Sequence, residues 1–177
     1  MKLISPILLV LILAGCKQVT KKPKSIELIT DWKKQDTIFL KLLTVTNKKL
    51  PETVQNDSLA FLILPVQASC PSCRKKTIDS IIKNSNSLLP NHYIIISANG
   101  GRKIINSYFL EEHASIPNMP DQVFIDSINL ASNYELYDEK PTMYYTFQRK
   151  AYKKVSSIPA TVKEDLHEFF SGSNSAE

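Results

Sequence analysis

The feature that most constrains this chain is an apolar run that leads directly into a pair of cysteines. Residues 59–66 are apolar almost without interruption, which predicts a strand buried on both faces. The sequence Cys70-Pro-Ser-Cys73 follows, and three isoleucines between residues 78 and 82 then recur at helical spacing. We therefore expect the two thiols in the first turn of a helix, where their sulfurs can approach within disulfide distance.

The start of a helix gives the two cysteines different chemistry. Unsatisfied backbone N–H groups and the positive end of the helix dipole favour a thiolate at Cys70. We therefore expect Cys70 to be the attacking sulfur and Cys73 to be the resolving thiol. Between them, Pro71 and Ser72 are expected to tune the stability of the disulfide. The basic residues at 74–76 either favour the thiolate or form a solvated helix face, and the sequence leaves both interpretations open.

The N-terminal segment has the pattern of a secretory signal. A basic start precedes an apolar stretch that is too short to span a bilayer, which predicts a signal peptide at residues 1–15. The sequence Leu13-Ala-Gly-Cys16 resembles the lipobox of bacterial lipoproteins, which implies that Cys16 is acylated and becomes the new N-terminus. Residues 16–25 would then be a basic tether to the membrane of the cell envelope. A plain signal peptide with an accidental cysteine is the alternative.

Lipidation at Cys16 would account for the odd cysteine. Of the three cysteines, Cys70 and Cys73 would remain as a pair, in a compartment where disulfides form and persist. The net charge of +5 is spread along the chain, so no nucleic-acid partner is expected. The length of 177 residues suits one domain, which we place at residues 26–171 and follow with a disordered tail at residues 172–177.

The pattern of apolar residues predicts alternating strands and helices. Strands are expected at residues 37–46, 59–66, 92–98, 122–126, 138–147 and 151–156. Helices are expected at residues 70–88, 103–112, 129–137 and 160–170. This order indicates the α/β class, with one mixed sheet and helices on both of its faces.

The combination of motifs resembles the thioredoxin-like superfamily. A strand, a Cys-x-x-Cys pair at a helix start and the later stretch Lys140-Pro-Thr-Met-Tyr-Tyr-Thr-Phe147 before a hairpin carry the resemblance, which covers about residues 59–170. Within the superfamily, the chain is similar to the membrane-anchored thiol-disulfide oxidoreductases of the TlpA and ResA type. The resemblance implies a thioredoxin-like fold, in which a mixed central β-sheet is flanked by helices on both faces.

The same resemblance implies how substrates bind. The proline that matches Pro141 would be cis and packed against the cysteine pair, with the backbone carbonyl and N–H of Lys140 offered to a substrate. The implied activity is disulfide exchange with exported proteins, without a cofactor and with a redox partner in the membrane. The domain would face the periplasm or the exterior.

The surroundings of the cysteines depart from the family pattern. Ser69 stands where thioredoxins commonly have tryptophan, and Leu64 stands where they have a buried aspartate that takes a proton from the second cysteine. Glu111 and Glu112 are possible substitutes for that aspartate. Weak acid–base support would slow resolution of a mixed disulfide without preventing it.

Two other uses of the cysteine pair remain open at this point. The pair could be a structural disulfide in a non-enzymatic binding lipoprotein. Alternatively, the two thiolates could bind copper(I) together with His113 or Met119, as in copper chaperones of the same fold. Zinc is disfavoured, because it needs four ligands and the chain has neither a second Cys-x-x-Cys pair nor a closely spaced pair of histidines. We assign no metal ligand.

Overall fold

The computed structural model describes residues 26–172. The predicted signal peptide at 1–15, the lipidation site Cys16, the tether at 16–25 and the tail beyond residue 172 lie outside the described residues. No helix in the described part of the chain is long and apolar enough to cross a membrane.

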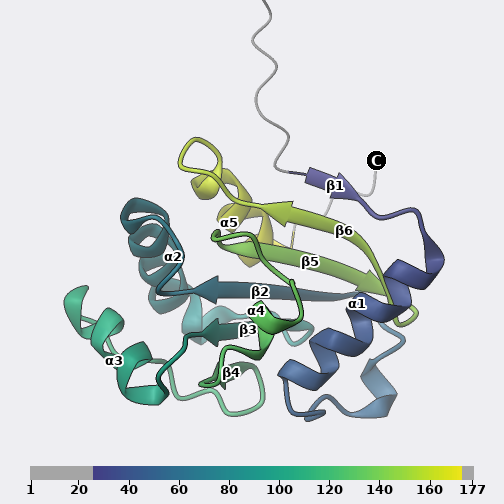
Figure 1. The fold of residues 1–177 in the computed structure, drawn as a ribbon, viewed down its shortest axis with the longest axis horizontal. Helices are drawn as coiled ribbons and strands as arrows, with labels where there is room; N and C mark the ends of the chain where they lie inside the picture. The colour runs from purple at the N-terminus through teal and green to yellow at the C-terminus, as the bar shows by residue number, and fades with distance from the viewer. Residues whose placement is uncertain (1–25, 173–177) are drawn as a thin grey trace, which may run out of the picture.

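The centre of the molecule is a six-stranded mixed sheet with the strand order β1-β6-β5-β2-β3-β4 (Figure 1). Strand β2 pairs in parallel with β3, which pairs in parallel with β4. On its other side, β2 pairs antiparallel with β5, and the antiparallel pairing continues through β6 to β1. The strands are β1 (Ile26–Leu28), β2 (Leu59–Pro65), β3 (His92–Ser97), β4 (Val123–Asp126), β5 (Thr142–Phe147) and β6 (Lys150–Ser156).

Helices cover both faces of this sheet. One core lies between the sheet and helices α2, α3 and α5, and the other lies between the sheet and helices α1 and α4. This arrangement confirms the predicted α/β class with a mixed central sheet. The helices are α1 (Trp32–Val45), α2 (Pro71–Asn84), α3 (Arg102–Glu111), α4 (Leu130–Asn133) and α5 (Val162–Ser171), with short 3₁₀ turns η1 (Glu52–Val54) and η2 (Ser85–Ser87).

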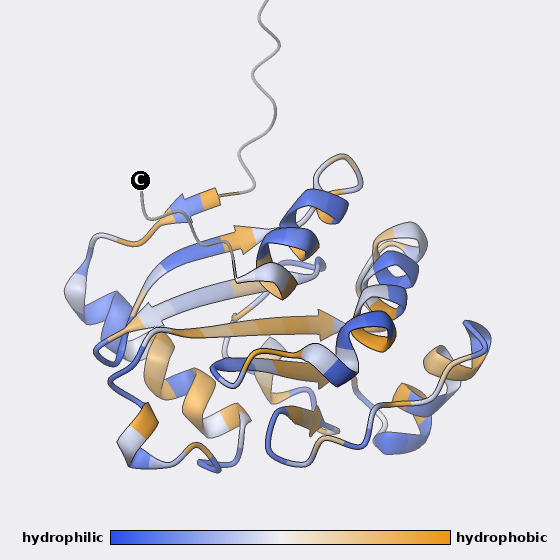
Figure 2. Ribbon diagram, turned by 180° about the vertical axis from the view of Figure 1, so that it is seen from behind, coloured by the Kyte–Doolittle hydropathy of each residue, from blue (hydrophilic) through white to orange (hydrophobic). Residues whose placement is uncertain are grey.

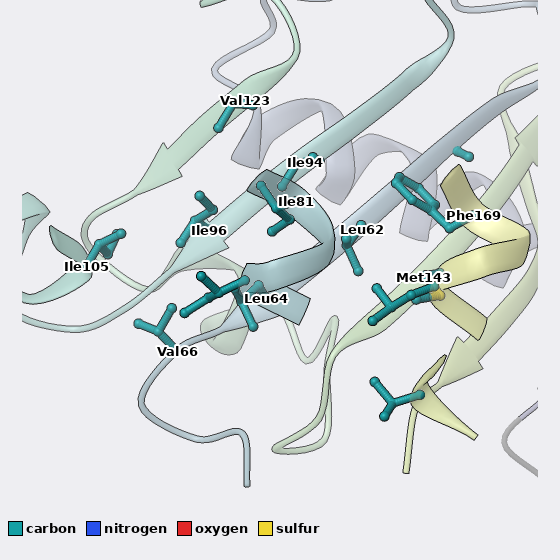
Figure 3. Close-up of a cluster of buried hydrophobic side chains, with 14 of the residues drawn as sticks. Leu62, Leu64, Val66, Ile81, Ile94, Ile96, Ile105, Val123, Met143 and Phe169 are labelled. Atoms are coloured by element: carbon teal, nitrogen blue, oxygen red, sulfur yellow. The ribbon is translucent and has the colours of Figure 1, made fainter. Parts of the chain in front are cut away.

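Strand β2 is the most deeply buried part of the fold, and every residue in it is buried. Its side chains alternate, so that Leu62 and Leu64 enter the core under α2 and α5 while Phe61 and Ile63 enter the core under α1. Figure 2 shows β2 as hydrophobic along its length. The side chains of the first core meet between the sheet, α2 and α5 in Figure 3. This burial on both faces fixes β2, and with it the start of α2.

The prediction of a strand at residues 37–46 was wrong. This segment is the greater part of helix α1, whose buried residues are Ile38, Phe39, Leu42, Leu43 and Val45. Their spacing follows the helical period, whereas a strand would have alternated. Asp31 starts the helix by accepting a hydrogen bond from the backbone N–H of Lys34 at 2.8 Å. The β-branched and aromatic composition of the segment was therefore overridden by packing against the sheet.

Other boundaries also differ from the prediction: the helix predicted at residues 129–137 covers only Leu130–Asn133, and the strand predicted at residues 138–147 begins at Thr142. Helix α2 ends at Asn84, and the predicted last turn towards residue 88 is the 3₁₀ turn η2. The edge strand β1 was not predicted, because three residues are too few to show a periodic pattern. It pairs with β6 through Ile26, opposite Val155, and Leu28, opposite Lys153.

Candidate active site

Both cysteines lie in the first turn of α2, directly after the end of β2. Cys70 is the N-cap residue, with extended backbone dihedrals, and Pro71 occupies the first helical position, where its missing N–H costs nothing. The thiol of Cys70 is half-buried and that of Cys73 is buried, and both are free. The sequence therefore placed the pair correctly at a helix start.

The sulfur of Cys70 accepts hydrogen bonds from the turn that it caps. The backbone N–H of Cys73 donates to Cys70 Sγ over 3.2 Å, and the hydroxyl of Ser72 lies 3.5 Å from the same sulfur. Burial by itself raises the pKa of Cys70. Hydrogen bonds from the thiol of Cys73, the hydroxyl of Ser72 and the two backbone N–H groups outweigh burial and leave this pKa lowered. The first cysteine is thus prepared to be a thiolate.

The pKa of the Cys73 thiol is shifted in the opposite direction. Burial, hydrogen bonding to Cys70 and the negative charge of the Cys70 thiolate together raise its pKa to about 11. The hydroxyl of Ser72 and the charge of Lys76 lower it in part. The pKa values of the two thiols are therefore shifted in opposite directions, so that Cys70 loses its proton first, which is the asymmetry that a nucleophile and a resolving thiol require. The pair fits a redox role.

The three basic residues after Cys73 have separate partners. Arg74 donates to the carbonyl of Val66 over 3.2 Å, lies 3.8 Å from a carboxylate oxygen of Glu111 and stacks over the ring of Tyr108. Lys75 forms ion pairs with Glu112 and Asp79. Lys76 reaches the carbonyl of Pro159, and it is the one whose charge lowers the pKa of Cys73. The basic residues therefore do not all favour a thiolate, and they do not all form a solvated helix face.

These contacts also decide what the neighbouring carboxylates can do. Leu64, at the position of the family's buried aspartate, is completely buried among apolar side chains (Figure 3). Glu111 and Glu112, the possible substitutes, pair with Arg74 and Lys75 on the surface of α2 and α3. The groups that shift the pKa of Cys73 are Cys70, Ser72 and Lys76, so neither glutamate takes the place of the aspartate there.

Lys140 and Pro141 lie at the same edge of the sheet as the cysteines. Strand β5 starts at Thr142, which pairs with Ile63 near the end of β2, because the two strands are antiparallel. The carbonyl of Pro141 accepts from the backbone N–H of Ser157 at 2.8 Å, and the hydroxyl of Thr142 donates to the carbonyl of Lys140 at 2.9 Å. One of the two predicted substrate-binding groups of Lys140 therefore already has a partner within the domain.

The expectation of a cis bond before Pro141 was wrong. The described residues contain no cis peptide bond, so the Lys140–Pro141 bond is trans. The trans isomer is the one that bonds preceding proline prefer, by about 0.5–1 kcal/mol.

One contact beside the pair was not predicted. The side-chain oxygen of Gln67, three residues before Cys70, accepts a hydrogen bond from the backbone N–H of Asn99 at 2.7 Å. This bond holds the loop before the cysteines against the loop that follows β3. The signal available in the sequence was weak, because a glutamine and an asparagine after two neighbouring strands are common loop residues.

No metal site accompanies the cysteines in the described part of the chain. Within residues 26–172, no group of three or more His, Cys, Asp or Glu side chains could hold a metal ion. Met119, a candidate copper ligand, packs instead against the core beneath α3. His113 follows α3 with left-handed backbone dihedrals and is exposed.

Comparisons with known proteins find only distant similarity to this chain. No family model and no curated protein matches it. Among solved structures, the chain is similar to a DsbF homologue from Corynebacterium diphtheriae, with 9% sequence identity and a TM-score of 0.37 over 64% of this chain and 71% of that chain. A similarity at this level carries no functional argument. The chemistry of the site therefore follows from the geometry of the two cysteines.

Proposed function

We propose that this protein is a thiol-disulfide oxidoreductase, anchored by a lipid on Cys16 and facing the periplasm or the exterior of the cell envelope. The observation that carries the proposal is the acid–base asymmetry of Cys70 and Cys73 in a single helical turn. A structural bridge has no need of one thiol prepared as a thiolate and one held protonated, whereas disulfide exchange needs both.

The reaction follows from the two thiols. The Cys70 thiolate attacks one sulfur of a substrate disulfide, which forms a mixed disulfide and releases the other substrate sulfur as a thiolate. Cys73 then gives up its proton and attacks Cys70 Sγ, which forms the Cys70–Cys73 disulfide and frees the second substrate thiol. Two electrons have passed to the substrate. The reverse sequence would oxidise a substrate dithiol, and the reduction potential of the pair decides the direction.

The substrates that we propose are exported proteins with disulfides or free thiols. Cys70 is half-buried, and the two residues that follow it, Pro71 and Ser72, are both exposed. The N–H of Lys140 and the surface of Pro71 would contact the substrate backbone beside the reacting sulfur. A membrane redox partner would return the pair to its starting oxidation state.

Reduction of insulin disulfides by the full chain tests the proposal. Cys70→Ser should abolish the reaction because it removes the nucleophile. Cys73→Ser should still attack but should accumulate a mixed disulfide that mass spectrometry detects. Equal rates for wild type and Cys70→Ser would overturn the enzyme assignment. A reduction potential below about −300 mV would instead indicate a structural bridge.

The anchor is tested separately, with the protein extracted from the membrane fraction of its host. Mass spectrometry of the N-terminal peptide should show acyl chains on Cys16 and no residue before it. The variant Cys16→Ala should leave the membrane fraction. An unmodified Cys16 in the mature protein would refute the anchor without bearing on the thiol chemistry.

A further inference from the structure

Four apolar side chains lie exposed at one corner of the sheet, around β1 and the β5–β6 hairpin. Their exposed fractions are 47% for Ile26, 69% for Leu28, 49% for Phe147 and 39% for Tyr152. Single exposed apolar residues are common on protein surfaces, so their significance depends on whether they share one face.

The two residues from β1 point to the α5 side of the sheet. Glu27 forms an ion pair with Lys34 of α1, which places it on the α1 side. Because side chains alternate along a strand, Ile26 and Leu28 face the opposite side, where α5 lies. Neither of them belongs to the core that α5 covers.

The two residues from the hairpin point to the same side. Phe147 follows Tyr145 by two residues in β5, and Tyr145 belongs to the core beneath α5. Tyr152 lines the same cavity as Phe147, and the carboxylate of Glu168 in α5 adds to the effect of burial in raising the pKa of Tyr152. The four side chains therefore share one face.

Trp32, four residues after Leu28 in the first turn of α1, lies beyond the end of β1 rather than on this face of the sheet. It is 59% exposed, and Gln35 lies one turn further along the same side of the helix. Gln35 in turn borders a cavity of about 460 Å³ together with Ser58, Phe147, Gln148, Lys150 and Tyr152. We call the surface formed by Ile26, Leu28, Trp32, Phe147 and Tyr152 the apolar corner.

The chain that precedes the apolar corner indicates what covers it. Ile26, a member of the corner, is also the residue at which the described chain begins. Nine residues separate it from Cys16, a length that spans at most about 35 Å. Four of the 22 basic residues and none of the 17 acidic residues lie between Cys16 and Ile26. The exposed cations Lys33 and Lys150 flank the corner itself.

We propose that the apolar corner docks on the surface of an anionic lipid bilayer. The inference rests on the lipid anchor of the proposed function, since a tether of this length would keep the corner close to the membrane at a high local concentration. Tryptophan and tyrosine favour the interface between water and lipid, and the basic segment and flanking lysines match anionic head groups.

Trp32 provides the test, because it is the only tryptophan of the chain. The intact protein is reconstituted into vesicles of phosphatidylcholine and phosphatidylglycerol, with and without bromine on the acyl chains. Docking predicts that the Trp32 emission shifts to the blue and is quenched by the brominated lipid. Vesicles without phosphatidylglycerol should give weaker quenching.

Matched variants distinguish docking through the apolar corner from contact of other surfaces with lipid. Leu28→Glu and Phe147→Glu should each lose most of the quenching. Leu110→Glu should retain it, because Leu110 is 67% exposed, much like Leu28, but lies on α3 away from the corner. Circular dichroism of each variant confirms folding, and all three should reduce insulin in detergent at the wild-type rate.

Three results would overturn the proposal. They are unquenched Trp32 emission in the reconstituted protein, equal quenching in Leu28→Glu and wild type, and a shift that depends on protein concentration without lipid, which would make a second copy the occupant. Loss of insulin reduction with retained quenching would refute the proposed enzyme and leave the docking surface intact.

Discussion

Cys70 and Cys73 share one backbone turn but differ in the groups that face their sulfurs. The hydrogen bonds that favour the Cys70 thiolate come from Cys73 and Ser72, so the resolving thiol is itself part of what activates the nucleophile. The deprotonation of Cys70 should therefore depend on what occupies position 73.

This dependence predicts the alkylation behaviour of two variants. Cys73→Ser keeps both the backbone N–H and a side-chain donor, whereas Cys73→Ala keeps only the backbone N–H. The pH at which iodoacetamide modifies Cys70 at half its maximal rate should be higher in Cys73→Ala than in Cys73→Ser, and in both it should be below the value for a free thiol. Mass spectrometry of the modified peptide measures these rates. Identical profiles for the two variants would show that the side chain at 73 contributes nothing.

Arg74 holds the first turn of α2 to two other parts of the fold. Its bond to the carbonyl of Val66 reaches the segment after β2, and its stacking on Tyr108, 4.5 Å from the ring centre, reaches α3. Its Nε atom is buried and has no partner. Because α2 and α3 are far apart in sequence, the role of this arginine could not be predicted from a run of three basic residues.

We expect Arg74→Ala to lower the free energy of unfolding by about 2 kcal/mol, since it removes a hydrogen bond from a charged donor and a cation–π contact. Arg74→Lys should recover only part of this loss, because lysine cannot stack and bond at the same time. Urea unfolding followed by circular dichroism gives both values. The exposed Lys103 on α3 serves as control, and Lys103→Ala should change the free energy by less than about 0.5 kcal/mol.

Among the elements, the strands buried on both faces were the most predictable, and helix α1 was the least predictable. Strands β2 and β3 are continuous apolar runs, and their positions follow from that pattern. Helix α1 is rich in β-branched and aromatic residues, and only the sheet beneath it selects the helix. The start of α2 was predictable because Pro71 and the two cysteines mark it locally. The isomer of the Lys140–Pro141 bond was not predictable, because the local sequence allows both the cis and the trans form.

Helix α4 depends on a buried carboxylate at the end of β4. Oδ1 of Asp126 accepts from the N–H of Leu130, and Oδ2 accepts from the N–H of Ala131 and the hydroxyl of Ser97, all within 2.8 Å. The residue is only 4% exposed. This arrangement ties α4 to the parallel strands β3 and β4, and it explains how a helix of four residues is held in place.

Asp126→Ala should therefore lower the free energy of unfolding by about 3 kcal/mol, because it leaves buried donors without an acceptor. Asp126→Asn should lower the free energy of unfolding by less, since one side-chain oxygen remains as an acceptor. Chemical denaturation measures both variants. Asp121→Ala, in the exposed turn before β4, is the matched control and should lie within about 0.5 kcal/mol of wild type. A similar loss in both alanine variants would contradict the capping role.

At the scale of the whole molecule, acid should loosen the packing of α5 on the sheet. His92 begins β3, is buried and stacks on Phe169 of α5 with ring centres 4.9 Å apart. Burial lowers its pKa, and a backbone hydrogen bond with Phe169 opposes the effect in part. The unfolded chain therefore binds the proton more readily than the folded domain, so stability falls as the pH drops below about 6.5.

Unfolding at a series of pH values from 7.5 to 5.5 tests this expectation. The free energy of unfolding of wild type should decrease across this range by up to about 1.4 kcal/mol for each unit by which the pKa is lowered. His92→Gln should have a flatter pH profile, whatever its stability at neutral pH. His167→Gln, on the exposed side of α5, should keep the slope of wild type. Equal slopes in all three proteins would exclude His92 as the cause.

Because β2 and β5 run in opposite directions, docking by the Phe147 end of the apolar corner would hold the thiols above the membrane. Leu59, at the start of β2, pairs with Thr146 beside Phe147 of the apolar corner, and Pro65 lies six residues further along, which is about 20 Å of strand. A domain that rests on the bilayer by the Phe147 end of that corner would present Cys70 at roughly this height, whereas Ile26 lies level with Leu62, only three residues before Pro65. A redox partner would then have to carry its own cysteines on a projecting arm or domain, and thiols buried at the depth of the lipid would be out of reach.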